Sequence, residues 1–203
     1  LAQPGRTLLQ RVLGRQPGPR LVCADARQLP LARSAVQLVW SNLLLHWVTD
    51  PLAVFRECHR VLETGGLLMF ATLGPDSLRE LRAALPDHAG ERVHRFIDMH
   101  DLGDALVNAG FADPVMDMQR LTLTYPDHLA LIRDLRASSG TNAAKSRPKG
   151  LSGKEGWEAA RGKLLQAQVD GRLPLTLELV FGHAWRAAPK QTEDGRAVIQ
   201  FKK

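Results

Sequence analysis

Two polar groups follow apolar segments in the first quarter of the chain, and both are suited to binding a nucleoside. The first is Asp25-Ala26, which comes directly after Leu21–Ala24. An aspartate carboxylate at the end of a strand can accept a hydrogen bond from the exocyclic amine of an adenine, while the next backbone N–H meets a ring nitrogen. The alternative is that Asp25 forms a turn or caps a helix.

The second polar group follows the most apolar segment of this region, Val36–Ser41 (VQLVWS). Short polar side chains followed by a bulky apolar run are suited to the floor of a cofactor pocket. In the alternative, Ser41-Asn42 forms a turn and Trp47 packs in the core. The candidate cofactor-binding residues of this group are Ser41, Asn42, Leu43, His46 and Trp47.

Other catalytic patterns do not occur in the sequence. The seven histidines are scattered without an H-x-x-H or HExxH pair, so we predict no metal site. There is no G-x-S-x-G elbow and no phosphate-binding P-loop. Asp98, Asp101 and Asp104 recur every three residues, which we interpret as the start of a capped helix. We therefore assign no catalytic side chain.

These groups need elements that position them, and the first half of the chain alternates predicted strands with predicted helices. Apolar segments predict strands at Leu21–Ala24, Val36–Ser41 and Leu67–Leu73. Helix starts are predicted at Asp50-Pro51, at a capping box of Ser77 with Glu80, and at Asp98, and helix ends at Gly65-Gly66 and Gly110. The alternation predicts an α/β fold with a doubly wound (Rossmann-like), mostly parallel sheet. In such a sheet, ligands bind beyond the carboxyl ends of the strands.

The second half of the chain departs from this alternation. Val115–Thr124 predicts a strand, Asp127 predicts a helix start, and the small and basic segment Ser138–Gly153 predicts a loop. Leu175–Phe181 alternates, which predicts a strand whose even-numbered residues form a wetter side. We therefore expect a C-terminal elaboration made of helices and strands.

Positive charge is concentrated in the second half. The net charge is +6, and residues 120–163 carry nine Lys or Arg against four Asp or Glu. A basic face attracts acidic partners by long-range steering. Nucleic acid is not expected, because aromatic residues make up only 5% and no zinc-ligand spacing occurs. An acidic protein or an anionic substrate fits this region, and a solvated surface loop is the alternative.

Composition limits the compartment. Apolar residues make up 44% and charged residues 24%, and no stretch reaches the roughly 20 apolar residues that cross a bilayer. Two cysteines are too few for a disulfide framework, which favours reduced thiols. We expect a cytoplasmic protein without a membrane partner. The Arg-rich N-terminus leaves a mitochondrial transit peptide as the alternative.

Several stretches resemble a known family. VCADARQLPLARSAVQLVWSNLLLHW resembles the adenine-binding motif and fourth strand of class I methyltransferases, and FRECHRVLETGGLLMF is similar to the helix, turn and fifth strand that follow. Within that superfamily, the chain resembles the malonyl-acyl carrier protein O-methyltransferases of biotin synthesis, the BioC-type enzymes. The stretches that carry this resemblance are SNLLLHW, TLGPDSLREL, HRFIDMHDLGDALVNAGF, LIRDLRASSGTN and GRLPLTLELVFGHAW, and it runs from about Leu21 to Trp185.

The resemblance implies S-adenosylmethionine as the cofactor and a malonyl carboxylate as the methyl acceptor. A carboxylate is already ionised at neutral pH, so positioning and exclusion of water would supply the catalysis without a general base. A cation would hold the acceptor, ideally the planar fork of an arginine. Arg133 matches the family position, and the basic region would face the acidic carrier protein.

The resemblance also divides the chain into three parts. Residues 1–123 would form a partial methyltransferase core, 124–174 a helical insertion on the substrate side with a basic loop, and 175–203 the final core strand and a tail. The first strand of the family, with its G-x-G-x-G loop, does not occur here, and Leu1–Arg20 matches the helix after the second strand. We therefore expect a sheet that is incomplete at the N-terminus and open edges that favour self-association. We also expect weak or absent cofactor binding and impaired activity of this chain. Leu175–Leu177 also reads LTL where the family has LTY.

Two other functions fit the same pattern. A mitochondrial complex I assembly factor shares the C-terminal pattern and the methyltransferase fold, but it hydroxylates an arginine of a protein. A non-catalytic interaction protein, left after loss of the glycine loop, is the third possibility.

Overall fold

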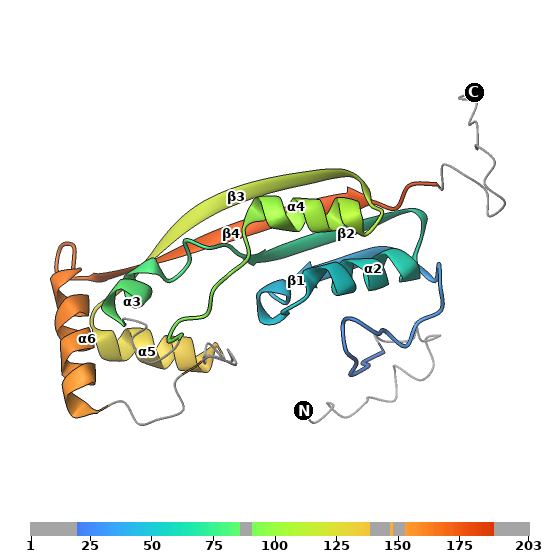
Figure 1. Cartoon of the computed structure of the whole chain (residues 1–203). Coiled ribbons are helices and arrows are strands. Elements are labelled where there is room, and N and C mark those ends of the chain that lie inside the picture. The colour runs from blue at the N-terminus through green and yellow to red at the C-terminus, as the bar shows by residue number, and fades with distance from the viewer. Residues whose placement is uncertain (1–19, 86–90, 139–146, 148–152, 189–203) are drawn as a thin grey trace, which may run out of the picture.

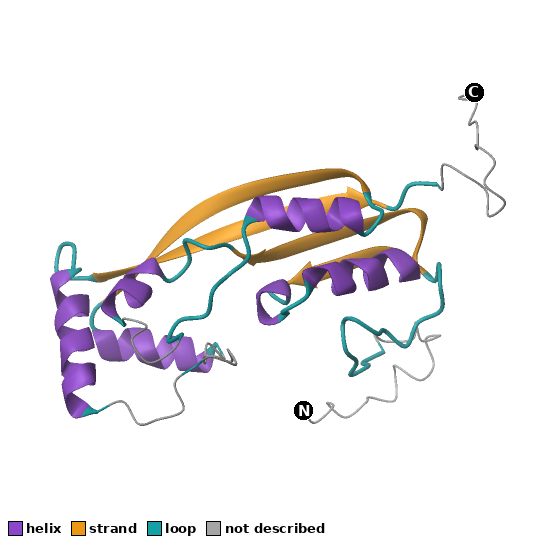
Figure 2. Ribbon diagram, viewed as in Figure 1, coloured by secondary structure: helices purple, strands orange, loops and turns teal. Residues whose placement is uncertain are grey.

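The computed structural model describes residues 20–85, 91–138, 147 and 153–188 (Figure 1). Within these ranges four strands and six helical segments follow one another, and Figure 2 shows the strands gathered into one sheet. In chain order the elements are β1 (Val36–Asn42), the short 3-10 helix η1 (Leu45–Trp47), α2 (Pro51–Val61), β2 (Leu62–Leu73), α3 (Arg79–Ala84), α4 (Met99–Asn108), β3 (Ala112–Tyr125), α5 (His128–Ala137), α6 (Lys154–Gln166) and β4 (Leu173–Trp185). No helix in these ranges is both long and apolar enough to cross a membrane.

The sheet is mixed, with the strand order β1-β2-β4-β3. The pairing of β1 with β2 is parallel, and β4 runs antiparallel to both β2 and β3. The predicted α/β class is confirmed, but the prediction of a mostly parallel sheet was wrong for the described strands. β1, β2 and β3 do point the same way. However, β4 enters between β2 and β3 in the opposite direction, so two of the three pairings are antiparallel.

The predicted strand at Leu21–Ala24 was also wrong, because this segment pairs with no strand among the described residues. Leu21 is 90% exposed. A short turn follows, in which the Gln28 N–H donates to the Asp25 carbonyl oxygen at 2.9 Å. Without a neighbouring strand, the backbone of an apolar segment has no ladder to join.

Three predicted helix starts are confirmed. The side chains of Asp50, Asp98 and Asp127 each accept a hydrogen bond from a backbone N–H in the first turn of α2, α4 and α5. The end of α2 differs, because it stops at Val61 and β2 already includes Gly65-Gly66. The register of β2 against β1 shifts here, and a side chain at Gly66 would meet the Gln37 carbonyl oxygen at 3.1 Å. Gly66 therefore serves a close strand approach, and Gly65 supplies a left-handed backbone with φ +80° within β2, so neither glycine ends the helix.

Helices α2 and α4 contact each other and pack on one face of the sheet, where Figure 1 shows them in front of the strands. The core of this face includes Phe55, Leu68, Phe70 and Val180. Within the described residues, the other face leaves large apolar side chains exposed. They are Leu38, Trp40, Met69, Val115, Phe181 and Trp185. Helices on both faces, which the doubly wound prediction requires, are therefore not seen in this part of the chain.

The two sides of β4 reverse the predicted pattern. Its even-numbered side was expected to be wetter, yet Thr176, Glu178 and Val180 are all buried, at 2%, 6% and 0% exposure. The odd-numbered Phe181 is 38% exposed. The reason is that the two polar side chains have hydrogen-bond partners in and before α3, since the Thr176 hydroxyl donates to Glu80 and the Glu178 carboxylate accepts from the Asp76 N–H, which allows their burial.

Candidate functional site

A pocket of about 370 Å³ lies at the carboxyl ends of β1 and β2. Its walls come from η1, α3, α5, the segment 92–96 and the neighbouring ends of β3 and β4. Most of the lining is aliphatic, as in a site for the apolar part of a ligand. The lining residues are Leu43, His46, Trp47, Leu73, Leu78, Leu81, Arg92, Val93, His94, Phe96, Leu123, Tyr125, Asp134, Leu135, Ser138, Leu175, Leu177 and Leu179.

An aromatic cluster forms one part of this wall. The ring centroids of His46 and Trp47 lie 5.0 Å apart, and the His94 ring stacks on Trp47 at 6.2 Å. The Phe96 ring meets both histidines edge to face, at 5.9 Å from His46 and 5.5 Å from His94. These contacts fix the two imidazoles beside each other.

Both histidines carry a buried nitrogen without a partner. Nδ1 of His46 and Nδ1 of His94 make no hydrogen bond within the described part of the chain. His46 is only 9% exposed. Burial lowers the pKa of His46, and the nearby His94 lowers it further, so the His46 imidazole is neutral at pH 7. A buried polar atom left without a partner costs about 1–3 kcal/mol, which a hydrogen-bonding ligand would recover.

A second polar pair lines the pocket from β3 and α5. The Tyr125 hydroxyl donates to Oδ2 of Asp134 at 2.6 Å. Burial, together with the Asp134 carboxylate, raises the pKa of Tyr125 to about 12. The bond joins the end of β3 to α5, in which only Leu131 is fully buried. It therefore helps to hold α5 over the pocket.

Two lining leucines have a left-handed backbone. Leu43 has φ +51° and Leu78 has φ +59°, a region that costs non-glycine residues about 1–2 kcal/mol each. The Leu43 N–H donates to the Ala71 carbonyl oxygen, and the Leu78 N–H donates to the Thr176 carbonyl oxygen, both at 2.8 Å. The sheet thus holds both turns in place at the pocket.

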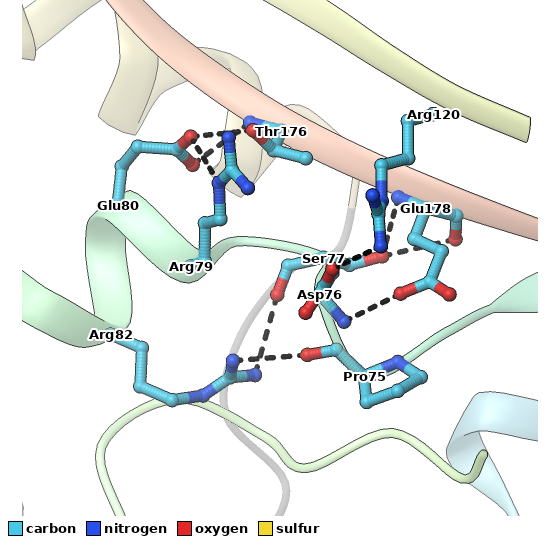
Figure 3. Close-up of polar contacts among 9 residues, drawn as sticks. All are labelled: Pro75, Asp76, Ser77, Arg79, Glu80, Arg82, Arg120, Thr176 and Glu178. Carbon is cyan, nitrogen blue, oxygen red and sulfur yellow. Dashed lines mark hydrogen bonds and ion pairs between the residues drawn. The ribbon is translucent and has the colours of Figure 1, made fainter.

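A polar network fixes the loop before α3 to β4, as Figure 3 shows. The Glu178 N–H donates to Ser77 Oγ at 2.9 Å, and the Asp76 N–H donates to the Glu178 carboxylate at 2.7 Å. The Glu80 carboxylate accepts from the Thr176 hydroxyl at 2.5 Å. The predicted capping box was therefore wrong, because Ser77 and Glu80 bond to β4 and Leu78 precedes the helix without a side-chain cap.

Arg82 links this loop to the aromatic cluster. Its guanidinium donates to the carbonyl oxygens of Pro75 and Ser77, as drawn in Figure 3, and also to that of His94 at 3.2 Å. The segment that carries His94 is irregular in structure. One side chain therefore holds the loop before α3 and the His94 backbone together.

The sequence-predicted adenine group lies outside the pocket. Asp25 is exposed and pairs with Arg27, whose hydrogen bonds lower the pKa of Asp25 to about 2. Ala26 packs against the core cluster that contains Leu45. Neither Asp25 nor Ala26 is among the residues that line the pocket beside the Asn42–Trp47 turn, so their role in binding an adenine stays a prediction.

The second predicted group divides between three places. Leu43, His46 and Trp47 line the pocket. Asn42 lies in a groove on the face of the sheet opposite α2 and α4, which we call the bare face. Oγ of Ser41 is buried without a partner in the described residues.

Arg133 lies on α5 with its side chain exposed, outside the pocket lining, although Asp134 and Leu135 line it. Its predicted role in binding the acceptor stays untested. Sequence reasoning missed His94, Phe96, Tyr125 and Asp134. A weak signal existed, since Val93, His94 and Phe96 stand in an irregular segment directly before the Asp98 cap, where a packed loop is expected.

The carboxyl edge of β1 and β2 fits one side of a polar cofactor. Ser41 Oγ and Thr72 Oγ1 are both buried here without a partner in the described residues. The left-handed Leu43 turns the chain away from the sheet at the same edge. Strained backbone and unsatisfied polar atoms together are typical of a ligand-binding edge.

The fold and a family match define the class. Residues 4–70 match the methyltransferase domain family. A candidate methyltransferase from Bacillus halodurans aligns over 81% of this chain and 76% of its own, with a TM-score of 0.51 and 16% identity. The YcgJ protein of Bacillus subtilis aligns over 82% of this chain and 70% of its own, with a TM-score of 0.52 and 12% identity. These structures share the fold of a methyltransferase domain.

Curated relatives give the particular family. A malonyl-[acyl-carrier protein] O-methyltransferase of Laribacter hongkongensis is 51% identical over 197 residues, which cover 95% of this chain and 66% of the relative. One from a Methylovorus species is 45% identical over 199 residues, which cover 97% of this chain and 67% of the relative. The chain therefore belongs to the malonyl-[acyl-carrier protein] O-methyltransferase family. It spans about two-thirds of the length of these relatives.

Proposed function

We propose that this chain serves S-adenosylmethionine-dependent methyl transfer to the free carboxylate of a malonyl-acyl carrier protein, a step of biotin synthesis. The observation that carries the proposal is the aliphatic pocket at the carboxyl ends of β1 and β2, with its unpartnered histidine nitrogens. Relatives that are 51% and 45% identical bear the name of this activity.

The proposed reaction requires the protein mainly to position the reactants and to exclude water. When bound, S-adenosylmethionine supplies an electrophilic methyl group on a sulfonium. An oxygen of the acceptor carboxylate would accept this methyl group, S-adenosylhomocysteine would be the leaving group, and no proton would have to move. The leucine-rich lining excludes water from this step. Asp134, the carboxylate in the lining, is occupied by Tyr125, which agrees with a reaction that needs no general base.

On the cofactor side, the proposal keeps five of the seven residues of the sequence prediction. Ser41, Asn42 and Leu43 would hold the adenosyl group at the end of β1, with Asp25 and Ala26 toward its adenine. The finer prediction of a doubly wound core, with helices on both faces, belongs to the same proposal. It would place the cofactor at the carboxyl edge of the sheet.

The partner would approach the helical part of the molecule. Exposed basic side chains stand on α5 (Arg133 and Arg136) and on α6 (Lys154 and Lys163). An acidic carrier protein is attracted to such a face over a distance of roughly 10 Å at moderate salt. Arg133, in this proposal, meets the carrier or its malonyl group at the rim.

The test is an assay of malonyl-acyl carrier protein methylation, in which the product is detected by its mass increase of one CH₂ group. Acetyl-acyl carrier protein, which has no free carboxylate, is the substrate control, and the longer Laribacter relative is the positive control. Calorimetry with S-adenosylhomocysteine measures the cofactor site separately. We expect at most weak binding of S-adenosylhomocysteine and slow methylation, compared with the Laribacter relative, of the malonyl form alone.

A matched pair of variants addresses the pocket. Leu177→Glu puts a charge into the lining and should reduce the methylation rate by at least about tenfold, since a buried charge is costly. Leu165→Glu makes the same change on α6, where Leu165 is exposed and outside the lining. Equal rates for both variants would contradict the assignment of this pocket.

A further inference from the structure

His46 and His94 share a property that the cofactor prediction does not use. Both rings line the pocket, both belong to the aromatic cluster, and each has a buried Nδ1 without a partner in the described residues. We propose that this histidine pair binds the carboxylate of the methyl acceptor through the two Nδ1 atoms. The inference rests on the proposed function and deepens it by naming the residues that recognise the acceptor.

The surroundings of the pair point to a ligand oxygen as the missing partner. Trp47 and Phe96 pack on the two rings, and most of the lining beyond them is leucine. Within the described residues, no protein group therefore forms a hydrogen bond with these nitrogens. A ligand that enters the pocket brings its own polar atoms.

The chemistry of the pair suits an anionic acceptor. A neutral imidazole has one N–H and one acceptor nitrogen, and the tautomer with its proton on Nδ1 donates to an oxygen. In this proposal two such donors each engage one oxygen of a carboxylate, and contact of both rings with Phe96 places the two side chains at the same wall of the pocket. A hydrogen bond to a charged group is stronger than one between neutral groups.

The position of the pair also gives the histidines a different role from that of Arg133. Arg133 is exposed and stands outside the lining, whereas His46 is nine-tenths buried within it. Arg133 would then draw the acceptor toward the rim, and the histidines would hold its carboxylate inside. Arg82 donates to the His94 carbonyl oxygen and so holds the backbone that carries the second imidazole.

The experiment compares the affinity of the full chain for malonyl- and acetyl-acyl carrier protein, since these differ in the carboxylate. We expect wild type to bind the malonyl form about tenfold more tightly. His46→Gln and His94→Gln move the amide toward the position of Nε2, and each should remove most of this preference. His46→Asn and His94→Asn place an amide near the position of Nδ1 and should keep it. His100→Asn, at an exposed histidine on α4, is the control and should leave the preference unchanged.

A second measurement does not depend on variants that fold. Malonyl-acyl carrier protein should shift the side-chain Nδ1 resonances of His46 and His94 in wild type, and acetyl-acyl carrier protein should not. Gln variants that keep the preference, or unchanged resonances, would overturn the inference while methylation could still occur. Equal affinity of wild type for both forms would overturn it as well. Loss of methylation with the preference intact in wild type would instead count against the proposed function alone.

Discussion

The two sides of β4 show opposite relations between polarity and burial. On the even-numbered side, Thr176 and Glu178 are polar and almost fully buried. On the odd-numbered side, Phe181 and Trp185 are apolar and 38% and 43% exposed. What decides burial is the element that covers each side. Helices and the loop before α3 cover the first and satisfy its polar groups, and no described element covers the second at its carboxyl end.

The largest effect on stability should come from the face of the sheet that α2 and α4 cover, to which the even-numbered side of β4 belongs. Phe70 packs against Phe55, with ring centroids 5.4 Å apart, and lies against Gly182 of β4. Phe70→Ala should lower the free energy of unfolding by about 3–5 kcal/mol, because it leaves a cavity in the core. Met69→Ala changes the next residue on the bare face and should cost less than about 1 kcal/mol. Urea unfolding measures both changes, and similar losses of unfolding free energy would contradict the contrast between the covered and the bare face.

A smaller effect should follow from the polar contact that allows Thr176 to be buried. Burial alone would raise the pKa of Glu80, but hydrogen bonds from the Thr176 hydroxyl and N–H outweigh it and lower that pKa. The lowered pKa makes this contribution to stability complete above the unfolded value near 4.5, and the contribution is lost as the pH falls below it. Glu80→Gln should cost about 1–3 kcal/mol at pH 7.

The pH dependence of this variant is the sharper test. The difference in unfolding free energy between wild type and Glu80→Gln should shrink as the pH drops below about 4.5, where the carboxylate of wild type takes up a proton. A difference that stays constant from pH 7 to pH 3 would show that the Glu80 charge does not support the burial of Thr176.

The smallest effect belongs to the bare side. Phe181→Gln should change the free energy of unfolding by no more than about 0.5 kcal/mol, as is usual for surface substitutions. It should also reduce the binding of a hydrophobic dye. A loss of 2 kcal/mol or more would mean that something covers this side in solution, and the contrast between the two sides would fail.

The sequence predicted elements well and their order poorly. The carboxylates of Asp50, Asp98 and Asp127 are local caps, and local chemistry is sufficient to place them. The insertion of β4 depends on its pairing with β2, which joins residues more than 100 positions apart, such as Leu73 with Leu179, and which no local pattern encodes. The Ser77–Glu80 spacing was misread for the same reason, since its real partners lie on β4.

The site was predicted in part. An apolar segment followed by SNLLLHW placed Leu43, His46 and Trp47 near a pocket, and all three line it. Asp25 could not be placed, because the segment before it pairs with no described strand. His94 and Tyr125 stand far from His46 in the chain, so only the folded sheet brings these residues to one cavity.

The middle position of β4 has a consequence for synthesis on the ribosome. β2 and β3 have no direct pairing and are joined only through β4, the last described strand to be made. A nascent chain halted after Ala137 therefore has β3 without a partner among these strands. The four-stranded sheet can be completed only when residues 173–185 emerge. Until then, long unpaired strands are open to non-native association, which makes this chain a candidate client for a holding chaperone. Hydrogen exchange on such halted chains should show β3 amides without protection.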